Sequence, residues 1–363
     1  MKKNQITGFL PLCRTEALER GWEQPDFVYV TGDAYVDHPS FGTTVIARVL
    51  EADGFRVAIC AQPDWHSAEA ITAFGRPRLG VMIGAGNLDS MVAHYTAAKK
   101  RRSEDFYSPG KRTGLRPDRA TIVYANRARE AFGSEIPIVI GGLEASLRRF
   151  AHYDYWDDKV RRSVLCDSGA DLLLYGMGER SIVETADALS GGLDIKDITY
   201  IAGSCYMTSS LERVYDYELI ESYEDVAADR KKYASAFMKQ YREQDAIRGK
   251  RLVQPHGNAY IVVNPPSMPL SEEELDAVYD LPYTRAPHPS YRGEIPALKE
   301  VKFSLASCRG CFGGCSFCAL TFHQGRVVQA RSHASLIREA ALMTHDREFK
   351  GGGLPLPRLQ KAA

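Results

Sequence analysis

The sequence predicts an α/β protein whose parallel sheet is doubly wound, with helices on both faces, over residues 20–205. Continuously apolar runs that end at or near a small residue predict strands covered on both faces. Between the first two of them, apolar residues at helical spacing predict a helix that ends at Gly54. In such sheets, ligands bind at the carboxyl ends of the strands. The expected strands are residues 26–32, 55–61, 78–84, 136–142 and 171–176.

The composition is that of an ordinary globular protein, because 44% of the 363 residues are hydrophobic and 25% are charged. The 46 basic and 46 acidic residues give no net charge, so no global charge favours a nucleic acid or a membrane surface. No stretch has the length of apolar sequence that spans a bilayer, and the N-terminus lacks a signal-peptide pattern. We expect a cytoplasmic protein without a membrane partner, whose thiols are reduced.

Residues 206–295 are predicted to form a helical and proline-rich connector. Residues 211–250 are rich in helix formers and charges, which predicts one or two amphipathic helices. Within the proline-rich stretch that follows, Ser271 and Glu274 have capping-box spacing, so a short helix is expected to begin there.

Two glycine-containing loops follow predicted strands, at residues 141–146 (GGLEAS) and 176–181 (GMGERS). Each is compatible with an anion at a helix N-terminus, but a tight turn with a helix cap is the favoured interpretation. Neither carries the complete dinucleotide fingerprint. Residues 99–130 are rich in Lys and Arg. This segment is predicted to be a solvated loop that leads into a helix, rather than an RNA contact.

Four of the eight cysteines lie within residues 308–318, in the stretch CRGCFGGCSFC. The alternation of Val301, Phe303 and Leu305 with polar residues predicts a strand that leads into this stretch. Zinc is disfavoured because paired CxxC sites usually have about a dozen or more residues between the pairs. Disulfides are disfavoured in a reducing compartment.

Short spacings favour iron-sulfur ligation, because each thiolate can bind a different corner of one cluster. Cys311, Cys315 and Cys318 would supply three ligands for four irons and leave one iron open. With Cys308 as a fourth ligand, the stretch would instead hold an electron-transfer cluster. Both alternatives stand at this point.

The run Cys311-Phe312-Gly313-Gly314-Cys315-Ser316-Phe317-Cys318 resembles the CxxxCxΦC signature of the radical SAM superfamily, and nearly the whole chain resembles its YgiQ family. The resemblance implies a [4Fe-4S] cluster on Cys311, Cys315 and Cys318 that binds S-adenosylmethionine. Reductive cleavage, with electrons from a reductant such as flavodoxin or ferredoxin, would give a 5'-deoxyadenosyl radical that acts on an unknown substrate. Phe317 would lie against the adenine, although core packing is an equally good interpretation.

The resemblance also implies that residues 20–205 are similar to cobalamin-binding domains. The Asp-x-His-x-x-Gly motif that supplies an axial imidazole to cobalamin is absent. Asp37, His38 and Gly42 are present, but their spacing in the sequence does not match the motif. Cobalamin is therefore a disfavoured cofactor, and a scaffold or substrate-docking role is preferred.

Residues 296–350 are similar only to the first unit of a radical SAM (β/α) barrel. A helix capped by Ser332 is expected, with Leu336, Ala340 and Met343 on one face. Residues 351–363 read as a divergent tail, so we expect an incomplete barrel.

The resemblance implies an enzyme for the family, whereas this chain is expected to be less active alone. The alternatives are an inactive fragment or a non-enzymatic iron-sulfur or nucleic-acid-binding protein. A tRNA methylthiotransferase is disfavoured because the remaining cysteines are scattered: Cys13, Cys60, Cys166 and Cys205.

Overall fold

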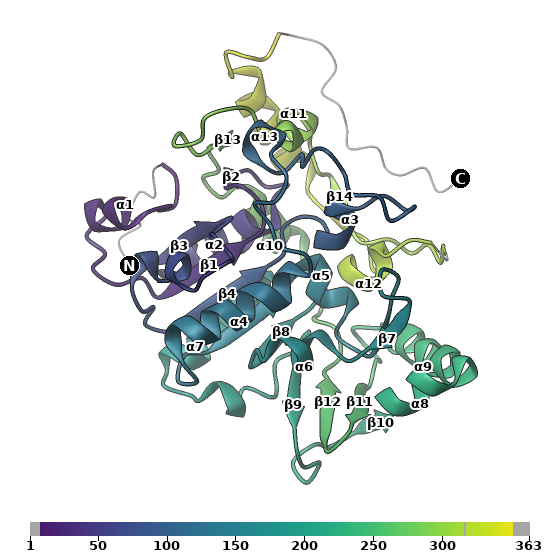
Figure 1. Cartoon of the computed structure of the whole chain (residues 1–363). Coiled ribbons are helices and arrows are strands. Elements are labelled where there is room, and N and C mark those ends of the chain that lie inside the picture. Colours follow the sequence, from purple (N-terminus) through teal and green to yellow (C-terminus); the bar gives the residue numbers. More distant parts are fainter. Residues whose placement is uncertain (1–7, 316, 351–363) are drawn as a thin grey trace.

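One nine-stranded sheet runs through the molecule (Figure 1). The computed structural model describes residues 8–315 and 317–350, so the predicted tail at 351–363 lies outside the described residues. The strands lie side by side in the order β10-β11-β12-β9-β8-β5-β4-β1-β3.

The five predicted strands form the parallel part of this sheet, in the order β3-β1-β4-β5-β8. This order is that of flavodoxin-like doubly wound domains, and the direction in which strands are added reverses between β1 and β4. The predicted fold class is confirmed. The strands are β1 (Phe27–Thr31), β3 (Val57–Ala61), β4 (Gly80–Gly84), β5 (Ile138–Gly141) and β8 (Leu172–Leu174).

Both faces of the sheet are buried, because successive side chains of β1 enter two different cores. Val28 and Val30 pack in the core beneath α4 (Ala120–Phe132) and α6 (Val164–Ser168). Phe27 and Tyr29 enter the opposite core, which α2 (Gly42–Ala52) and α7 (Glu179–Ser190) cover. This double burial explains why the strands are continuously apolar in sequence.

The sheet continues into the segment that the sequence predicts as a connector. Four further strands are added. Three neighbouring pairs are antiparallel: β8 with β9, β9 with β12, and β12 with β11. The helices of the segment are present as well, and α10 begins with the predicted capping box of Ser271 and Glu274. These elements are β9 (Ser204–Thr208), β10 (Tyr217–Leu219), α8 (Tyr223–Ala228), α9 (Arg230–Arg242), β11 (Arg251–His256), β12 (Ala259–Val263) and α10 (Glu272–Tyr279).

The strand predicted from Val301 to Leu305 is wrong. A helix, α11 (Pro296–Val301), occupies its start, because Pro296 stands in the first helical turn, where proline is favourable. The cysteine-rich stretch begins instead at β14 (Cys308–Arg309), which pairs antiparallel with β15 (Gln329–Ala330).

A short helix, α12 (Leu320–Gln324), follows the cysteines, and the predicted helix capped by Ser332 is α13 (His333–Thr344). Met343 is buried on α13, and Leu336 and Ala340 are half-buried. The remaining helices and strands are α1 (Arg14–Glu19), β2 (Val36–Asp37), α3 (Ser90–His94), α5 (Gly142–Leu147), β6 (His152–Asp154), β7 (Lys159–Arg161) and β13 (Ala286–Pro287).

The basic segment that follows α3 is anchored by one buried arginine. Arg116 is 1% exposed and donates to Asp33 (2.8 Å), Asp105 (2.9 Å) and the Ala85 carbonyl (3.0 Å). Asp33 follows β1 and Ala85 follows β4, so the guanidinium bridges the point where the strand order reverses. The predicted solvated loop is therefore correct for the exposed residues 99–102 and wrong for Arg116.

We expect Arg116→Ala to lower the free energy of unfolding by about 3 to 5 kcal/mol, because it leaves two buried carboxylates without their partner. Urea denaturation followed by circular dichroism measures the change. Arg112→Ala, in the same segment but exposed, serves as the control and should stay within about 0.5 kcal/mol of the parent. A loss below about 1 kcal/mol for Arg116→Ala would contradict the anchoring role.

Candidate functional site

A cavity of about 600 Å³ lies at the carboxyl edge of the parallel strands. Both predicted glycine loops contribute to it, through Gly141 and Gly142 after β5 and through Gly176 to Glu179 after β8. The cysteine-rich stretch and α12 close the other side, where Cys308, Cys318 and His323 line the cavity. The ligand-binding edge of the doubly wound domain thus faces the thiol-bearing segment.

The thiols of Cys311 and Cys315 both lie close to Gly313. A Cβ at Gly313 would lie 3.2 Å from Cys311 Sγ and 3.8 Å from Cys315 Sγ, so glycine leaves room for both sulfur atoms. The Gly313 N–H donates to Cys311 Sγ at 3.3 Å. Backbone N–H donation to sulfur is a feature of iron-sulfur sites, where it tunes the reduction potential.

Cys318 and Cys308 line the cavity from the same stretch. Over residues 8–315 and 317–350, no three Cys, His, Asp or Glu side chains form a group that could hold a metal ion. The structure therefore brings two of the three predicted ligands to one glycine and places the third beside the cavity. The set of soft thiolate donors, with an N–H directed at one of them, fits an iron-sulfur cluster chemically.

The backbone of the stretch requires glycine at position 310. Gly310 has φ +82°, and a Cβ there would lie 2.2 Å from the Val327 carbonyl oxygen. Its N–H donates to Gln324 Oε1 at 3.1 Å, and the Cys311 N–H donates to the Gly325 carbonyl at 3.1 Å. These bonds tie the segment before Cys311 to the end of α12.

Phe317 is 90% exposed, and it does not line the cavity. Core packing, one of the two interpretations of this residue, is therefore wrong. Contact with an adenine ring stays a prediction.

A buried ion pair joins the cysteine-rich stretch to the sheet domain. Arg309 Nη1 donates to Glu179 Oε1, and Arg309 and Glu179 are 6% and 4% exposed. Arg309 Nε also donates to the Tyr279 hydroxyl at 3.2 Å, at the end of α10. Sequence patterns did not predict this pair. Glu179 belongs to the glycine loop GMGERS, and Arg309 lies between Cys308 and Cys311 in the cysteine-rich stretch.

His323 makes a second connection, from α12 to α5. Its Nδ1 lies 3.2 Å from Ser146 Oγ, and α12 packs against α5 (Figure 1). Burial lowers the pKa of His323 to about 4, so the imidazole is neutral at pH 7.

The residues after β1 do not fit an axial cobalamin ligand. His38 is fully buried, its Nδ1 accepts from the Ser40 N–H at 3.1 Å, and it does not line the cavity. Asp37 is held in an ion pair with Arg48. His38 is therefore not placed to reach a ligand in the cavity, and the disfavoured role of cobalamin stays a prediction.

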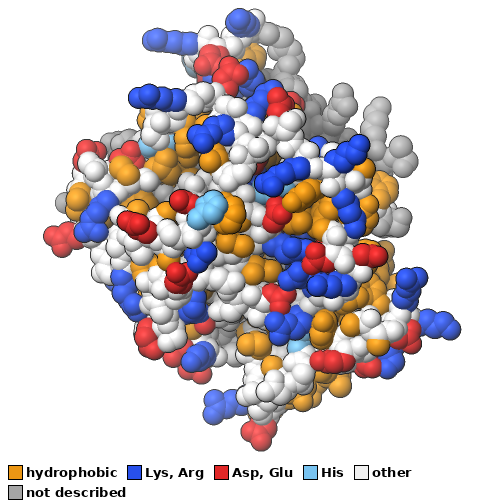
Figure 2. Space-filling view, viewed as in Figure 1, with side chains coloured by type: hydrophobic (Ala, Val, Ile, Leu, Met, Phe, Trp, Pro, Cys, Tyr) orange, Lys and Arg blue, Asp and Glu red, His pale blue; other side chains and the backbone are white. Residues whose placement is uncertain are grey.

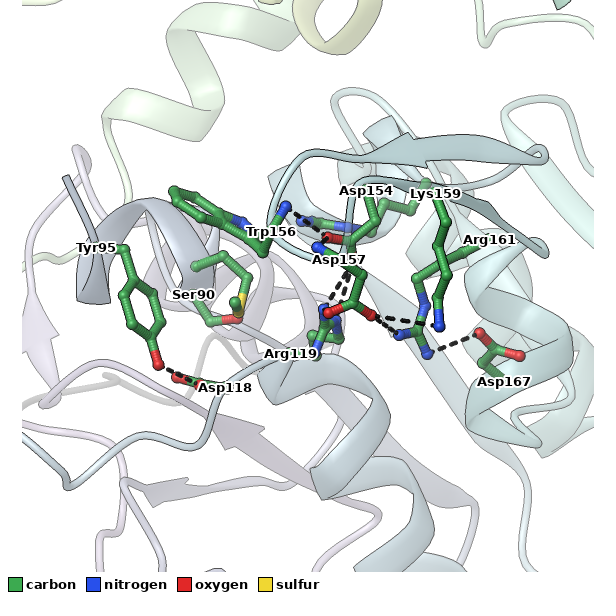
Figure 3. Close-up of polar contacts among 12 residues, drawn as sticks. Ser90, Tyr95, Asp118, Arg119, Asp154, Trp156, Asp157, Lys159, Arg161 and Asp167 are labelled. Carbon is green, nitrogen blue, oxygen red and sulfur yellow. Dashed lines mark hydrogen bonds and ion pairs between the residues drawn. The ribbon is translucent and has the colours of Figure 1, made fainter. Parts of the chain in front are cut away.

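Arginines near the hairpin of β6 and β7 are paired with carboxylates (Figure 3). Arg119 contacts Asp154 and Asp157 at 2.9 Å, and Arg161 contacts Asp157 at 2.9 Å. Figure 2 shows basic and acidic side chains mixed over one face of the molecule. Both arginines are thus engaged by carboxylates, and the absence of a nucleic-acid partner stays a prediction.

The fold and the site define a doubly wound α/β protein whose ligand-binding edge is covered by a thiol-rich segment. The chain belongs to the family described as Radical SAM N-terminal, which matches residues 9–304. The predicted radical SAM membership is confirmed. Among the helices of the described residues, none combines the length and apolar composition needed to cross a bilayer.

Curated relatives extend the similarity through the cysteines. A UPF0313 protein of Clostridium perfringens (strain SM101 / Type A) is 57% identical over 346 residues, which cover 94% of this chain and 52% of the relative. A UPF0313 protein of Clostridium botulinum (strain Kyoto / Type A2) is 56% identical over 345 residues, 94% of this chain and 53% of the relative. The chain thus spans about half the length of these relatives.

Two solved structures of TsrM, a radical S-adenosylmethionine methyltransferase from Kitasatospora setae, are also similar. The one with tryptophan substrate and the SAM analogue aza-SAM bound has a TM-score of 0.47 and 18% identity, over 86% of this chain and 44% of that one. The one with cobalamin and a [4Fe-4S] cluster bound has a TM-score of 0.46 and 16% identity, over 87% and 45%.

We expect acidification to destabilise the protein through His323. Its pKa is about 4 in the folded state, against an ordinary value of 6.5, so below pH 6.5 the unfolded state binds the proton more readily. The free energy of unfolding should therefore fall between pH 6.5 and about 4, by up to about 1.4 kcal/mol per pH unit from this residue. Urea denaturation of the cluster-free protein over this range measures it.

His323→Asn should make this decline shallower, because the amide can still face Ser146 but does not titrate. His333→Asn, at an exposed histidine of α13, is the control and should leave the decline unchanged. The same pH slope in His323→Asn and the parent would refute the assignment.

Proposed function

We propose that this protein is the cluster-bearing part of a radical SAM enzyme, in which Cys311, Cys315 and Cys318 hold a [4Fe-4S] cluster that binds S-adenosylmethionine. The observation that carries the proposal is the position of Gly313, which lies close to two thiols and donates its N–H to one of them. Family membership supports it, since the family is a radical SAM family.

When bound, the cluster supplies one electron to S-adenosylmethionine, which yields methionine and a 5'-deoxyadenosyl radical. The chain's own residues prepare the place for this reaction. Gly310 and Gln324 fix the backbone that precedes Cys311, and the Gly313 N–H withdraws charge from Cys311 Sγ. Arg309 holds the segment over the cavity through Glu179. A substrate in the cavity would lie beside Cys318.

The proposal includes a reduced cytoplasmic setting, in which thiolates persist and a flavodoxin or ferredoxin supplies the electron. The competing candidate is an electron-transfer cluster with Cys308 as its fourth ligand. Cys308 belongs to β14, where it pairs with Ala330, and it lies in the cavity lining. Variants of the four cysteines separate the two functions.

After anaerobic reconstitution, the broad iron-sulfur absorption should be lost in Cys311→Ala, Cys315→Ala and Cys318→Ala and retained in Cys308→Ala. The reason is that three thiolates suffice for a cluster with one open iron. Iron and sulfide quantification accompanies the spectra, and Cys13→Ala, at an exposed cysteine elsewhere, is the control. Loss of the cluster in Cys308→Ala would favour the electron-transfer function. Stoichiometric zinc without reconstitutable iron would exclude both.

With dithionite and S-adenosylmethionine, we expect this chain to release 5'-deoxyadenosine more slowly than the full-length relative from Clostridium perfringens. In the described residues after α11, the strands β14 and β15 pair only with each other, and they are antiparallel. This part of the chain therefore contains no parallel barrel strands that would position the sulfonium of S-adenosylmethionine. Chromatography of the quenched reactions measures the product. Equal rates for the two proteins would show that the described segment suffices.

A further inference from the structure

Helix α9 carries an exposed face that is both apolar and basic (Figure 1). Ala236 is its only buried residue, whereas Phe237 and Met238 are 41% and 44% exposed. Lys231 and Arg242 are exposed and lie at helical spacing from Met238, so the three side chains share one stripe. We call this stripe, together with Phe237, the α9 face. Exposed apolar side chains rimmed by polar ones mark protein interaction sites.

The charge of this helix is positive, because it contains five Lys or Arg residues and no Asp or Glu. Two of them, Lys232 and Lys239, are paired with carboxylates in or beside α8. Arg230, Lys231 and Arg242 form no ion pair within the described part of the chain. Figure 2 shows Lys and Arg side chains projecting at the edge of the molecule where α9 lies. A partner that presents negative charge would complement this surface.

The same helix contacts the cysteine-rich stretch. A Cβ at Gly314 would lie 3.1 Å from the Tyr241 hydroxyl oxygen, and Gly314 immediately precedes Cys315. On α12, the ring centroid of Phe322 lies 5.5 Å from that of Phe237 and 6.2 Å from that of Tyr241. The helix is therefore packed against the loop of the cysteines and against the helix that follows them. A molecule bound to the α9 face would lie close to Cys315, an exposed cysteine.

A second basic segment, residues 99–102, lacks this connection. Its side chains are exposed, but Lys99 Nζ donates to the Trp156 carbonyl at 3.2 Å and lies 4.9 Å from the ring centroid of Tyr155. Trp156 belongs to the turn between β6 and β7 (Figure 3). Within the residues that the structure describes, no hydrogen bond or ion pair joins this segment to residues 308–318. Residues 99–102 therefore provide a matched control for the α9 face.

We propose that the α9 face docks an acidic one-electron donor protein. The inference rests on the proposed function, because it assigns a docking surface to the donor that would reduce a cluster on Cys311, Cys315 and Cys318. The donor loses one electron and the cluster gains it, so no bond is made or broken and no proton moves. Electron transfer slows steeply with distance, so the donor must dock beside the cysteines. Electron-transfer complexes are small and weak, which suits a face built on one helix.

Binding is measured first on the cluster-free chain, with an oxidised flavodoxin of net negative charge as the probe. Isothermal titration calorimetry over a series of salt concentrations gives the affinity. The double variant Lys231→Glu/Arg242→Glu should weaken binding roughly tenfold or more at low salt, because two attractive charges become repulsive. The difference from the parent should shrink as salt screens the charges. Lys99→Glu/Arg101→Glu makes the same change of charge in the control segment and should keep the parent affinity.

Reduction of the reconstituted protein then tests whether the docked donor is placed to deliver its electron. Stopped-flow absorption follows bleaching of the cluster by flavodoxin hydroquinone, which becomes the semiquinone, and in a separate series by dithionite. Lys231→Glu/Arg242→Glu should slow reduction by the flavodoxin roughly tenfold, in step with the loss of binding. Reduction by dithionite should stay close to the parent rate, because this small reductant needs no docking face.

The proposal is overturned if flavodoxin does not bind the parent, or if it binds the parent and the α9 variant equally. An equal loss in the control variant would also overturn it. A tRNA that binds more tightly than the flavodoxin, and is lost in the α9 variant, would assign the face to nucleic acid instead. A dimer that sedimentation detects in the parent, and that the α9 variant dissociates, would make the face a subunit interface. The binding measurements need no iron, so their failure is distinguishable from a failure of the cluster to assemble.

Discussion

The ion pair of Glu179 and Arg309 is the contact on which the rest of the site depends. It joins the first turn of α7 to β14, and both side chains are buried. Breaking a buried pair from one side leaves an uncompensated charge, which costs far more than an exposed pair gains. The ring of Tyr279 lies beside two guanidinium groups. Its centroid is 5.1 Å from Arg309 Cζ and 4.1 Å from Arg331 Cζ. The sheet, α10 and the cysteine-rich stretch therefore meet at one set of contacts, and the cavity exists between them.

Close approach of backbones explains two of the glycines at this edge. A Cβ at Gly32 would lie 2.2 Å from the Ala85 carbonyl oxygen. Gly176 has φ +81°, and its Cβ would lie 3.2 Å from the His323 carbonyl oxygen, so glycine lets α12 approach the turn after β8. The second glycine loop thus makes the tight turn that the sequence predicts at Gly176.

The sequence could predict what is encoded locally, and it missed what depends on partners far along the chain. Fully buried parallel strands are continuous apolar runs, so β1, β3, β4, β5 and β8 were recognisable. β11 was not, because it contains Gln254, which is fully buried. Its side chain accepts from the Ala151 N–H (2.7 Å) and donates to the Glu221 carbonyl (3.0 Å). The thiol spacing is likewise local, whereas the pairing of Glu179 with Arg309 requires the three-dimensional arrangement.

The cysteine-rich stretch combines a thiol that lines the cavity with exposed aromatic side chains. Cys318 lines the cavity at the edge of the sheet. Phe312 and Phe317 are 84% and 90% exposed, and large aromatic side chains are costly to leave in water. This chain spans about half the length of its curated relatives. In those relatives, we expect the residues beyond the matched half to cover this aromatic face. Such a covering part would lower the exposure of the thiols to water in the relatives.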